Sequence, residues 1–266
     1  MTDKELKYGV LWGWDELVLA LYLYCQIPFA RTKANNPDVI SLARLIGRTP
    51  SAVARKLGNF GAFDPMLAVK GVRGLTHGSA MDRKVWDHFY GQWDSLVDKS
   101  QVLLEKKNAE PVYSSLQEEQ DDFSIISRPI GLTEKRSTVL TRLVQSFFRR
   151  AVLSSYESSC CICGTDIAQL LVASHIIPWS ESKGIRTDPE NGLCLCALHD
   201  KAFDRGLISL NTSLEILVSP VIKKTRSIFV RQAIIDFEDK KIISPKRFMP
   251  KTEYIEWHNI NIYKSA

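Results

Sequence analysis

The spacing of cysteine and histidine residues in the second half of the chain restricts its fold more than any other feature. Five of the six cysteines lie between Cys160 and Cys196. Cys160 and Cys163 are spaced C-x-x-C and precede a glycine, a pattern that lets two sulfurs face one ion. Cys196 and His199 are spaced C-x-x-H, so at the start of a helix they share a face. Together the two pairs predict a closed, structural Zn²⁺ site.

Two more cysteines leave the identity of the ligands open. Cys161 and Cys194 lie beside the predicted ligands in the sequence, and either could take the place of one of them. The alternative is that the cysteines are small buried apolar residues with no metal at all.

A second group of polar residues lies between and just after these two pairs. His175 follows the apolar run L-L-V-A, which predicts a strand that ends at this histidine. Asn191 comes later and can hold an imidazole or a loop through its amide. Asp200 and Asp204 are four residues apart, so on a helix both carboxylates project from one face. This arrangement suits a hard divalent cation such as Mg²⁺ or Mn²⁺.

The helix that carries these carboxylates could serve two metals. Asp200 directly follows His199, and one residue turns a helix by about 100°. The two predicted sites would therefore lie on adjacent faces. The alternative is that Asp200 and Asp204 are solvated or pair with Lys201 and Arg205.

The first region of the chain, residues 1–104, predicts a helix-turn-helix. A helix near 15–27 is stopped by Pro28, and a second apolar helical face precedes Gly47, which can end a helix in the left-handed conformation. Thr49 can cap a third helix with Pro50 in its first position. In this prediction four polar residues occupy the turn or the exposed face of the third helix and contact DNA: Arg48, Ser51, Arg55 and Lys56. The alternative is an ordinary helical hairpin with solvated basic residues.

The rest of this region and the next one carry weaker patterns. Residues 71–79 resemble a turn or β-wing, and a single helix is predicted over 81–98. Residues 105–133 are rich in Glu, Gln, Ser and Asp with little apolar periodicity, which predicts a linker.

A third region is predicted over residues 134–266, with its core at 160–210. Residues 135–150 contain five basic residues and no acidic one, beside a buried apolar stripe. Arg149 and Arg150 are therefore candidate phosphate contacts, with a solvated face as the alternative. After Gly206 the alternation of apolar and polar residues predicts a hairpin, and the tail to Ala266 carries no motif.

Composition and charge agree with a soluble protein. The formal net charge is +5 and the pI about 8.8, which permits nucleic-acid binding without requiring it. No apolar run reaches the 18 or so residues of a membrane span, and the N-terminus lacks a signal-peptide pattern. We therefore expect a cytoplasmic protein with no membrane partner, in a compartment where clustered cysteines bind metal.

The order C-x-x-C, S-H-I-I-P-W, Asn191 and C-A-L-H-D-K-A-F-D resembles the HNH, or ββα-metal, endonucleases. The match covers about 160–210, and the phrase A-F-D-R-G-L-I-S-L is similar to a restriction-type subgroup. The resemblance implies that His175 is the general base and that Asn191 positions the loop. It places metal ligands at Asp200 and Asp204.

The chain departs from the family pattern at two points. Ser174 stands where many members have a metal-binding Asp or His, which leaves Asp200 and Asp204 as the predicted catalytic ligands. If Cys163 does not bind zinc, His199 could instead join the catalytic metal.

The resemblance implies an α+β fold and a nuclease. It predicts an N-terminal helix-turn-helix or winged-helix-like domain, a linker and a C-terminal ββα-metal domain. The expected activity is metal-dependent hydrolysis of double-stranded DNA, of restriction type and either dependent on base modification or not. A homodimer would allow both strands to be cut. The alternatives are a zinc-braced DNA-binding regulator without activity and a nonspecific or homing-type nuclease, including a toxin.

Overall fold

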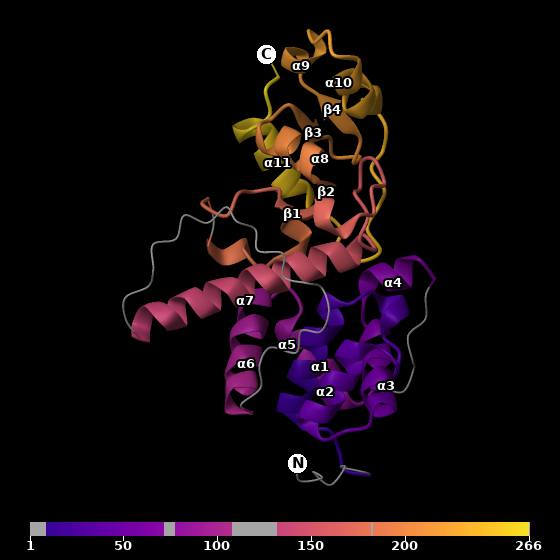
Figure 1. Cartoon of the computed structure of the whole chain (residues 1–266). Coiled ribbons are helices and arrows are strands. Elements are labelled where there is room, and N and C mark those ends of the chain that lie inside the picture. Colours follow the sequence, from indigo (N-terminus) through magenta and orange to yellow (C-terminus); the bar gives the residue numbers. More distant parts are fainter. Residues whose placement is uncertain (1–8, 72–77, 108–131, 182, 266) are drawn as a thin grey trace. The chain divides into compact units, whose positions relative to one another are not determined.

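The computed structural model describes residues 9–71, 78–107, 132–181 and 183–265 (Figure 1). The chain forms two compact units, Met1–Arg150 and Ala151–Ala266, which divide within a long helix, α7 (Leu132–Ser155). The predicted wing over 71–79 falls largely outside the described residues, and so does 108–131 of the predicted linker. Within the described ranges, no helix combines the length and apolar character that a membrane span requires.

The first unit is built from helices around α1 (Trp14–Gln26), which is buried from Glu16 to Gln26. A helix that is apolar on nearly all sides belongs in the centre of a unit, because every face must be covered. Its neighbours are α2 (Pro37–Ile46), α3 (Pro50–Gly61), α5 (Ala80–Phe89) and α6 (Trp93–Lys106). A short helix η1 (Phe29–Arg31) follows α1, and α4 (Pro65–Val69) follows α3.

The predicted pair of helices around a glycine turn is present. Gly47 ends α2 with a φ of 71°, in the left-handed region that favours glycine. Thr49 caps α3, its side chain accepting a hydrogen bond from the amide of Ala52 at 3.2 Å, and Pro50 is the first helical residue. Local sequence signals alone therefore set both the end of α2 and the start of α3.

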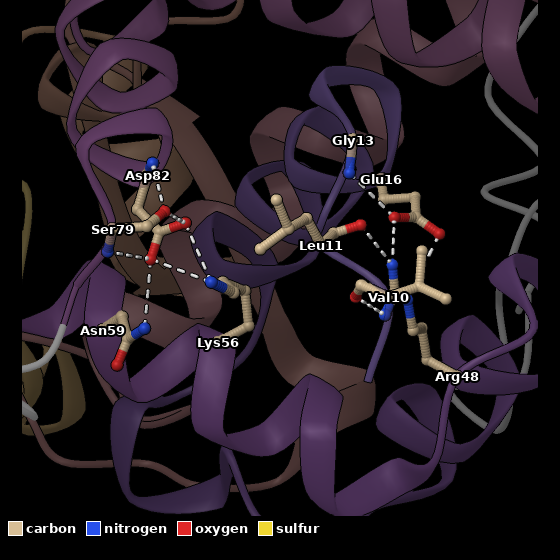
Figure 2. Close-up of polar contacts among 9 residues, drawn as sticks. All are labelled: Val10, Leu11, Gly13, Glu16, Arg48, Lys56, Asn59, Ser79 and Asp82. Carbon is tan, nitrogen blue, oxygen red and sulfur yellow. Dashed lines mark hydrogen bonds and ion pairs between the residues drawn. The ribbon is translucent and has the colours of Figure 1, made fainter. Parts of the chain in front are cut away.

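The expectation that Arg48 and Lys56 are exposed is wrong (Figure 2). Arg48 is 5 % exposed and forms an ion pair with Glu16 at 2.8 Å. Its guanidinium also donates to the carbonyl oxygens of Val10 at 2.6 Å and Leu11 at 2.9 Å. Arg48 therefore fastens the chain ahead of α1 to the turn between α2 and α3.

Lys56 makes a second buried ion pair on the same helix pair (Figure 2). Its ammonium lies 2.9 Å from each carboxylate oxygen of Asp82, which also accepts hydrogen bonds from Asn59 and Ser79. Burial raises the pKa of Asp82, but these hydrogen bonds outweigh it, and the pKa lies below its usual value. Lys56 thus joins α3 to α5.

The single helix predicted over 81–98 is also wrong, because the structure has two helices there. Gly91, with a φ of 80°, lies in the break between α5 and α6. The apolar positions of this stretch are buried as expected: Val85, Trp86, Phe89, Trp93 and Leu96.

The second unit contains two small antiparallel sheets and short helices. β1 (Leu171–His175) pairs with β2 (Gly192–Cys196), with His175 opposite Gly192, and α8 (Ala197–Asp204) follows directly. The predicted hairpin after Gly206 is present as β3 (Ile208–Leu210) and β4 (Ile216–Val218). Strand, strand and helix in this order give the expected ββα unit of an α+β fold.

The remaining helices of this unit are short. They are η2 (Ala168–Leu170), η3 (Lys183–Ile185), η4 (Pro189–Asn191), α9 (Pro220–Lys223), α10 (Ile228–Ala233), η5 (Ile235–Phe237) and α11 (Thr252–Asn261).

The C-terminal helix packs closely against the ββα unit. Gly206 has a φ of 66°, and a Cβ there would lie 2.0 Å from the carbonyl oxygen of Ile262. The amide of Lys264 donates to the carbonyl of Gly206 at 3.0 Å. Glycine is thus required where the chain leaves α8, because the end of α11 occupies the space of a side chain.

Candidate active site and metal centre

The predicted bracing residues lie together in the structure. The ligand atoms of Cys160, Cys163, Cys196 and His199 are all within 4.8 Å of one another. Nδ1 of His199 lies 3.6 Å from Sγ of Cys160 and 3.2 Å from Sγ of Cys196, and the sulfurs of Cys163 and Cys196 are 3.9 Å apart. Cys161 and Cys194 are buried but are not members of this cluster.

These separations fit a tetrahedral zinc ion. Bonds of about 2.3 Å to sulfur and about 2.0 Å to nitrogen place two sulfurs about 3.8 Å apart, and sulfur and nitrogen about 3.5 Å apart. Nε2 of His199 donates to the carbonyl oxygen of Ala233 at 2.8 Å, so the proton sits on Nε2 and Nδ1 is the nitrogen available to a metal. The Cys₃His cluster is therefore compatible with zinc, and His199 belongs to it.

His175 ends β1, as the sequence predicts, and its ring is held on two sides. Nε2 lies 3.1 Å from the carbonyl oxygen of Arg186, which can only accept, so this nitrogen carries the proton and Nδ1 is the basic one. The ring also meets Trp179 edge-on at 5.8 Å between centroids. Burial, together with the charge of Arg186, lowers the pKa of His175 to about 4, although the hydrogen bond to the carbonyl of Arg186 acts in the opposite direction. The imidazole is neutral at pH 7.

The side chain of Asn191 forms two hydrogen bonds with the loop that follows His175. Its Oδ1 accepts from the amide of Ile177 at 2.8 Å, and its Nδ2 donates to the carbonyl of the same residue at 3.1 Å. The backbone carbonyl of Asn191 also accepts from the amide of Ile176 at 2.9 Å. The side chain is fully buried, so the amide fixes the exit of β1 relative to the entry of β2.

Asp200 and Asp204 both lie on α8, four residues apart. Burial raises the pKa of Asp200, while the nearby hydroxyl of Ser174 lowers it. Burial raises the pKa of Asp204 too, and the charge of Asp200 adds to this rise. Among the described residues neither carboxylate forms an ion pair with Lys201 or Arg205. The charges of Lys201 and Arg205 lower the pKa of Asp204 against these two effects. A buried carboxylate whose pKa is raised by a neighbouring carboxylate favours a bound cation.

Ser174 lies on the strand next to His175 and is 3 % exposed. Its hydroxyl has no hydrogen-bond partner among the described residues. It nevertheless lies close enough to Asp200 to lower the pKa of that carboxyl group. The effect of Ser174 that the structure shows is therefore an effect on the carboxyl group of Asp200.

A pocket of about 290 Å³ is lined by His175 and Asp204, but not by Asp200 or Asn191. Its lining comes from β1 and the loop after it, from α8 and from α11: His175, Pro178, Lys201, Asp204, Arg205, His258 and Ile262. The cations of Lys201 and Arg205 make the pocket suitable for a phosphate group.

His258 is the residue of this pocket that the sequence motifs did not reveal. Its ring stacks on Phe203 at 3.8 Å, and its Nε2 donates to the carbonyl of Phe203 at 3.2 Å. Its Nδ1 lies 2.8 Å from Oγ of Ser209, and burial lowers its pKa to about 4. The buried positions of α11, Tyr254, Ile255 and His258, recur at helical spacing, and this was the available signal.

The predicted DNA contacts are divided between exposed and buried positions. Ser51 and Arg55 on α3 and Arg149 on α7 are exposed. Arg150 is not, because it forms an ion pair with Asp38 at 2.9 Å, with 12 % and 13 % of the two side chains exposed. The expectation of a free phosphate-binding face is therefore wrong for Arg150, as it is for Arg48 and Lys56.

The ββα unit, the Cys₃His cluster and the strand-end histidine together have the arrangement expected of a ββα-metal domain. Residues 160–211 match the family model of HNH endonucleases, so the chain contains an HNH endonuclease domain over these residues. The domain supports a nuclease, and it suggests DNA as the substrate. None of the curated proteins compared with the chain matches it.

Proposed function

We propose that the protein is a metal-dependent endonuclease that hydrolyses phosphodiester bonds of double-stranded DNA. The observation that carries this proposal is the shared pocket of His175 and Asp204, lined also by Lys201 and Arg205. A neutral base, a carboxylate and two cations around one pocket are the groups that hydrolysis of a phosphodiester needs.

His175 acts as the general base in this mechanism. Its Nδ1 takes a proton from water, and the resulting hydroxide attacks phosphorus. The bond from phosphorus to the 3′ oxygen breaks, which leaves a 5′-phosphate and a 3′-hydroxyl once that oxygen is protonated. The hydrogen bond from Nε2 to Arg186 holds the ring in the required tautomer, and Asn191 holds the loop beside it.

Lys201 and Arg205 neutralise the non-bridging phosphate oxygens. Asp200 and Asp204 would hold Mg²⁺ or Mn²⁺, which supplies positive charge for the phosphate and for the leaving oxygen. Cys160, Cys163, Cys196 and His199 would hold Zn²⁺, which would brace the first turn of the same helix.

We assign the protein a restriction-type role in defence against foreign DNA, with the first unit choosing the target. The exposed Ser51 and Arg55 on α3 support this, since α3 occupies the second position of a helix-turn-helix pair. One active site cuts one strand, so a double-strand break calls for a homodimer or for sequential nicking. The alternatives are a zinc-braced regulator that binds DNA without cutting it and a nonspecific nuclease toxin.

The test is cleavage of methylated and unmethylated plasmid with Mg²⁺ or Mn²⁺. We expect His175→Ala to lower the rate by about 10²–10⁴-fold, the usual contribution of a general base. The matched control is His88→Ala, an exposed histidine of the first unit, which should cut at the wild-type rate. Cleavage by His175→Ala at the rate of the control would contradict the assignment.

The products also separate the alternatives. Discrete bands support a restriction-type enzyme, and a smear supports a nonspecific nuclease. DNA binding without metal-dependent cleavage would support the alternative of a zinc-braced regulator.

A further inference from the structure

Helices α9 and α10 follow β4 in the second unit (Figure 1), and their segment carries an unusual set of exposed side chains. Between Pro220 and Ile235 the sequence has four basic residues and no acidic one. Lys223 forms an ion pair with Glu238. The other three cations, Lys224, Arg226 and Arg231, are exposed, and none of them forms an ion pair with another described residue.

Two large apolar side chains are exposed among these cations. Ile228 is 72 % exposed and its neighbour Phe229 is 65 % exposed. Both lie at the start of α10, between Arg226 and Arg231. An adjacent pair of this size on a protein surface indicates contact with a partner, whereas isolated apolar residues are common.

The C-terminal end of α10 and the residues after it are held by contacts with His199 and by burial. The carbonyl of Ala233, the last residue of α10, accepts the hydrogen bond from Nε2 of His199. His199 also meets Phe237 edge-on at 5.7 Å, and Ile234 is 4 % exposed. Ser227 caps α10 by accepting from the amide of Val230 at 3.3 Å. The Cys₃His cluster therefore supports the base of α10 while Ile228 and Phe229 face solvent.

The charge of the segment selects the partner. A second copy of the chain at this surface would bring like charges together, and so would any basic protein. The partner has to carry negative charge for the three cations and apolar surface for Ile228 and Phe229. A nucleic acid offers both, because its phosphates pair with the cations while its bases or sugars cover the apolar pair. Nucleic acid has this chemistry, and the HNH domain suggests that DNA is the substrate.

We infer that residues 223–231 form a second DNA-contacting segment outside the catalytic pocket. Lys224, Arg226 and Arg231 bind phosphates, and Ile228 and Phe229 pack against the base stack. This inference rests on the proposed function for its choice of DNA. It assigns the segment the task of holding the duplex, while the pocket carries out the cleavage.

The test measures binding of the full zinc-loaded chain to a labelled duplex of mixed sequence over a range of KCl, without added Mg²⁺ or Mn²⁺. For the triple variant Lys224→Gln, Arg226→Gln, Arg231→Gln, the slope of log K against log[salt] should be shallower by about 2.7, since each phosphate contact contributes about 0.9. Affinity near 0.1 M salt should fall roughly 100-fold. The matched control is Lys241→Gln, Lys246→Gln, Lys264→Gln, which removes the same charge elsewhere in the unit and should keep most of the wild-type slope.

The apolar pair is tested separately. Ile228→Ser with Phe229→Ser should weaken binding about 5–100-fold and leave the salt slope unchanged, because stacking on an aromatic side chain does not release counterions. Its control is Ile167→Ser with Ile260→Ser, a pair that is 54 % and 82 % exposed at other places in the unit. Zinc content and the midpoint of unfolding should match wild type in all four variants.

Three outcomes overturn the inference. The first is an equal salt slope for the triple variant and its control. The second is wild-type affinity of the apolar variant, and the third is a change in its oligomeric state with no change in affinity. Cleavage of plasmid is the independent readout. If DNA is cut but the segment variants bind normally, only this inference fails. If these variants lose binding in a protein that never cuts, only the proposed nuclease function fails.

Discussion

At the scale of single residues, Asn191 holds the loop next to His175 although it does not line the pocket itself. Its side chain satisfies both backbone polar groups of Ile177, two residues after His175. Ile177 is itself 8 % exposed, so without the amide its N–H and C=O would be buried with no equivalent partner. The position of the base and the stability of the unit therefore depend on one side chain.

We expect Asn191→Ala to destabilise the second unit by roughly 2–4 kcal/mol, because two buried polar groups lose their hydrogen bonds. Cleavage should fall as well, since the loop that carries the base loses its anchor. Urea unfolding and plasmid cleavage measure the two effects. The control is Asn261→Ala at an exposed position, which should change stability by no more than about 0.5 kcal/mol. A stable but inactive Asn191→Ala would instead assign the amide a direct part in the reaction.

At the scale of elements, the α2–α3 pair shows that basic residues in a helix-turn-helix pattern need not face DNA. Arg48 in the turn and Lys56 on α3 have buried carboxylate partners, whereas Ser51 and Arg55 are exposed. Of the four DNA contacts predicted in this helix pair, Ser51 and Arg55 are therefore the two that stay candidates. Arg48 and Arg55 allow a direct comparison, because they are close in sequence but one is buried and the other exposed.

Arg48→Ala should lower the stability of the first unit by roughly 3–5 kcal/mol, because it leaves the Glu16 carboxylate buried without its partner. Arg55→Ala should change stability by no more than about 0.5 kcal/mol. Thermal unfolding of the two variants makes the comparison. Equal midpoints would mean that the buried pair does not hold the turn, while weaker DNA binding by Arg55→Ala alone would support its role in recognition.

Local signals explain what the sequence predicted well. Gly47 and Thr49 act on residues within one turn of themselves, and the C-x-x-C and C-x-x-H spacings each lie within a few residues. The two spacings were sufficient to predict that these four side chains gather in one cluster, whereas the ββα unit was expected from the resemblance to the HNH endonucleases.

What the sequence could not predict depends on distant partners. Arg48 pairs with a residue 32 positions away and Lys56 with one 26 positions away, and no local pattern announces either carboxylate. His258 reaches the pocket through Phe203, 55 positions earlier. The break at Gly91 was missed because the apolar spacing continues across it at nearly helical period.

At the scale of the whole molecule, the two units differ in what stabilises them. The first has an extensive helical core around α1 and, among its described residues, no Cys/His cluster. The second has two small sheets and short helices gathered around the Cys₃His cluster. Metal should therefore contribute to the folding of one unit and not of the other.

Removal of zinc by a strong chelator should unfold the second unit while the first keeps its structure. Hydrogen exchange followed by peptide would show loss of protection over 171–218 and retention over 14–61. Cys160→Ser should reproduce the effect without chelator, and Cys194→Ser, a buried cysteine outside the cluster, should retain one zinc per chain. Equal loss of protection in both units would show that the metal stabilises the chain as a whole.

Helix α8 carries both the histidine of the Cys₃His cluster and the two predicted carboxylate ligands, and no residue separates His199 from Asp200. His199 faces the sulfurs, and the very next residue begins the carboxylate pair. Each residue inserted into a helix turns everything after it by about 100° and advances it by about 1.5 Å. A one-residue insertion between His199 and Asp200 would thus turn both carboxylates on the helix and move Asp204 out of the pocket that it shares with His175, although every side chain would still be present. Natural variation in length is therefore to be sought in the loop between β1 and β2, and not in α8.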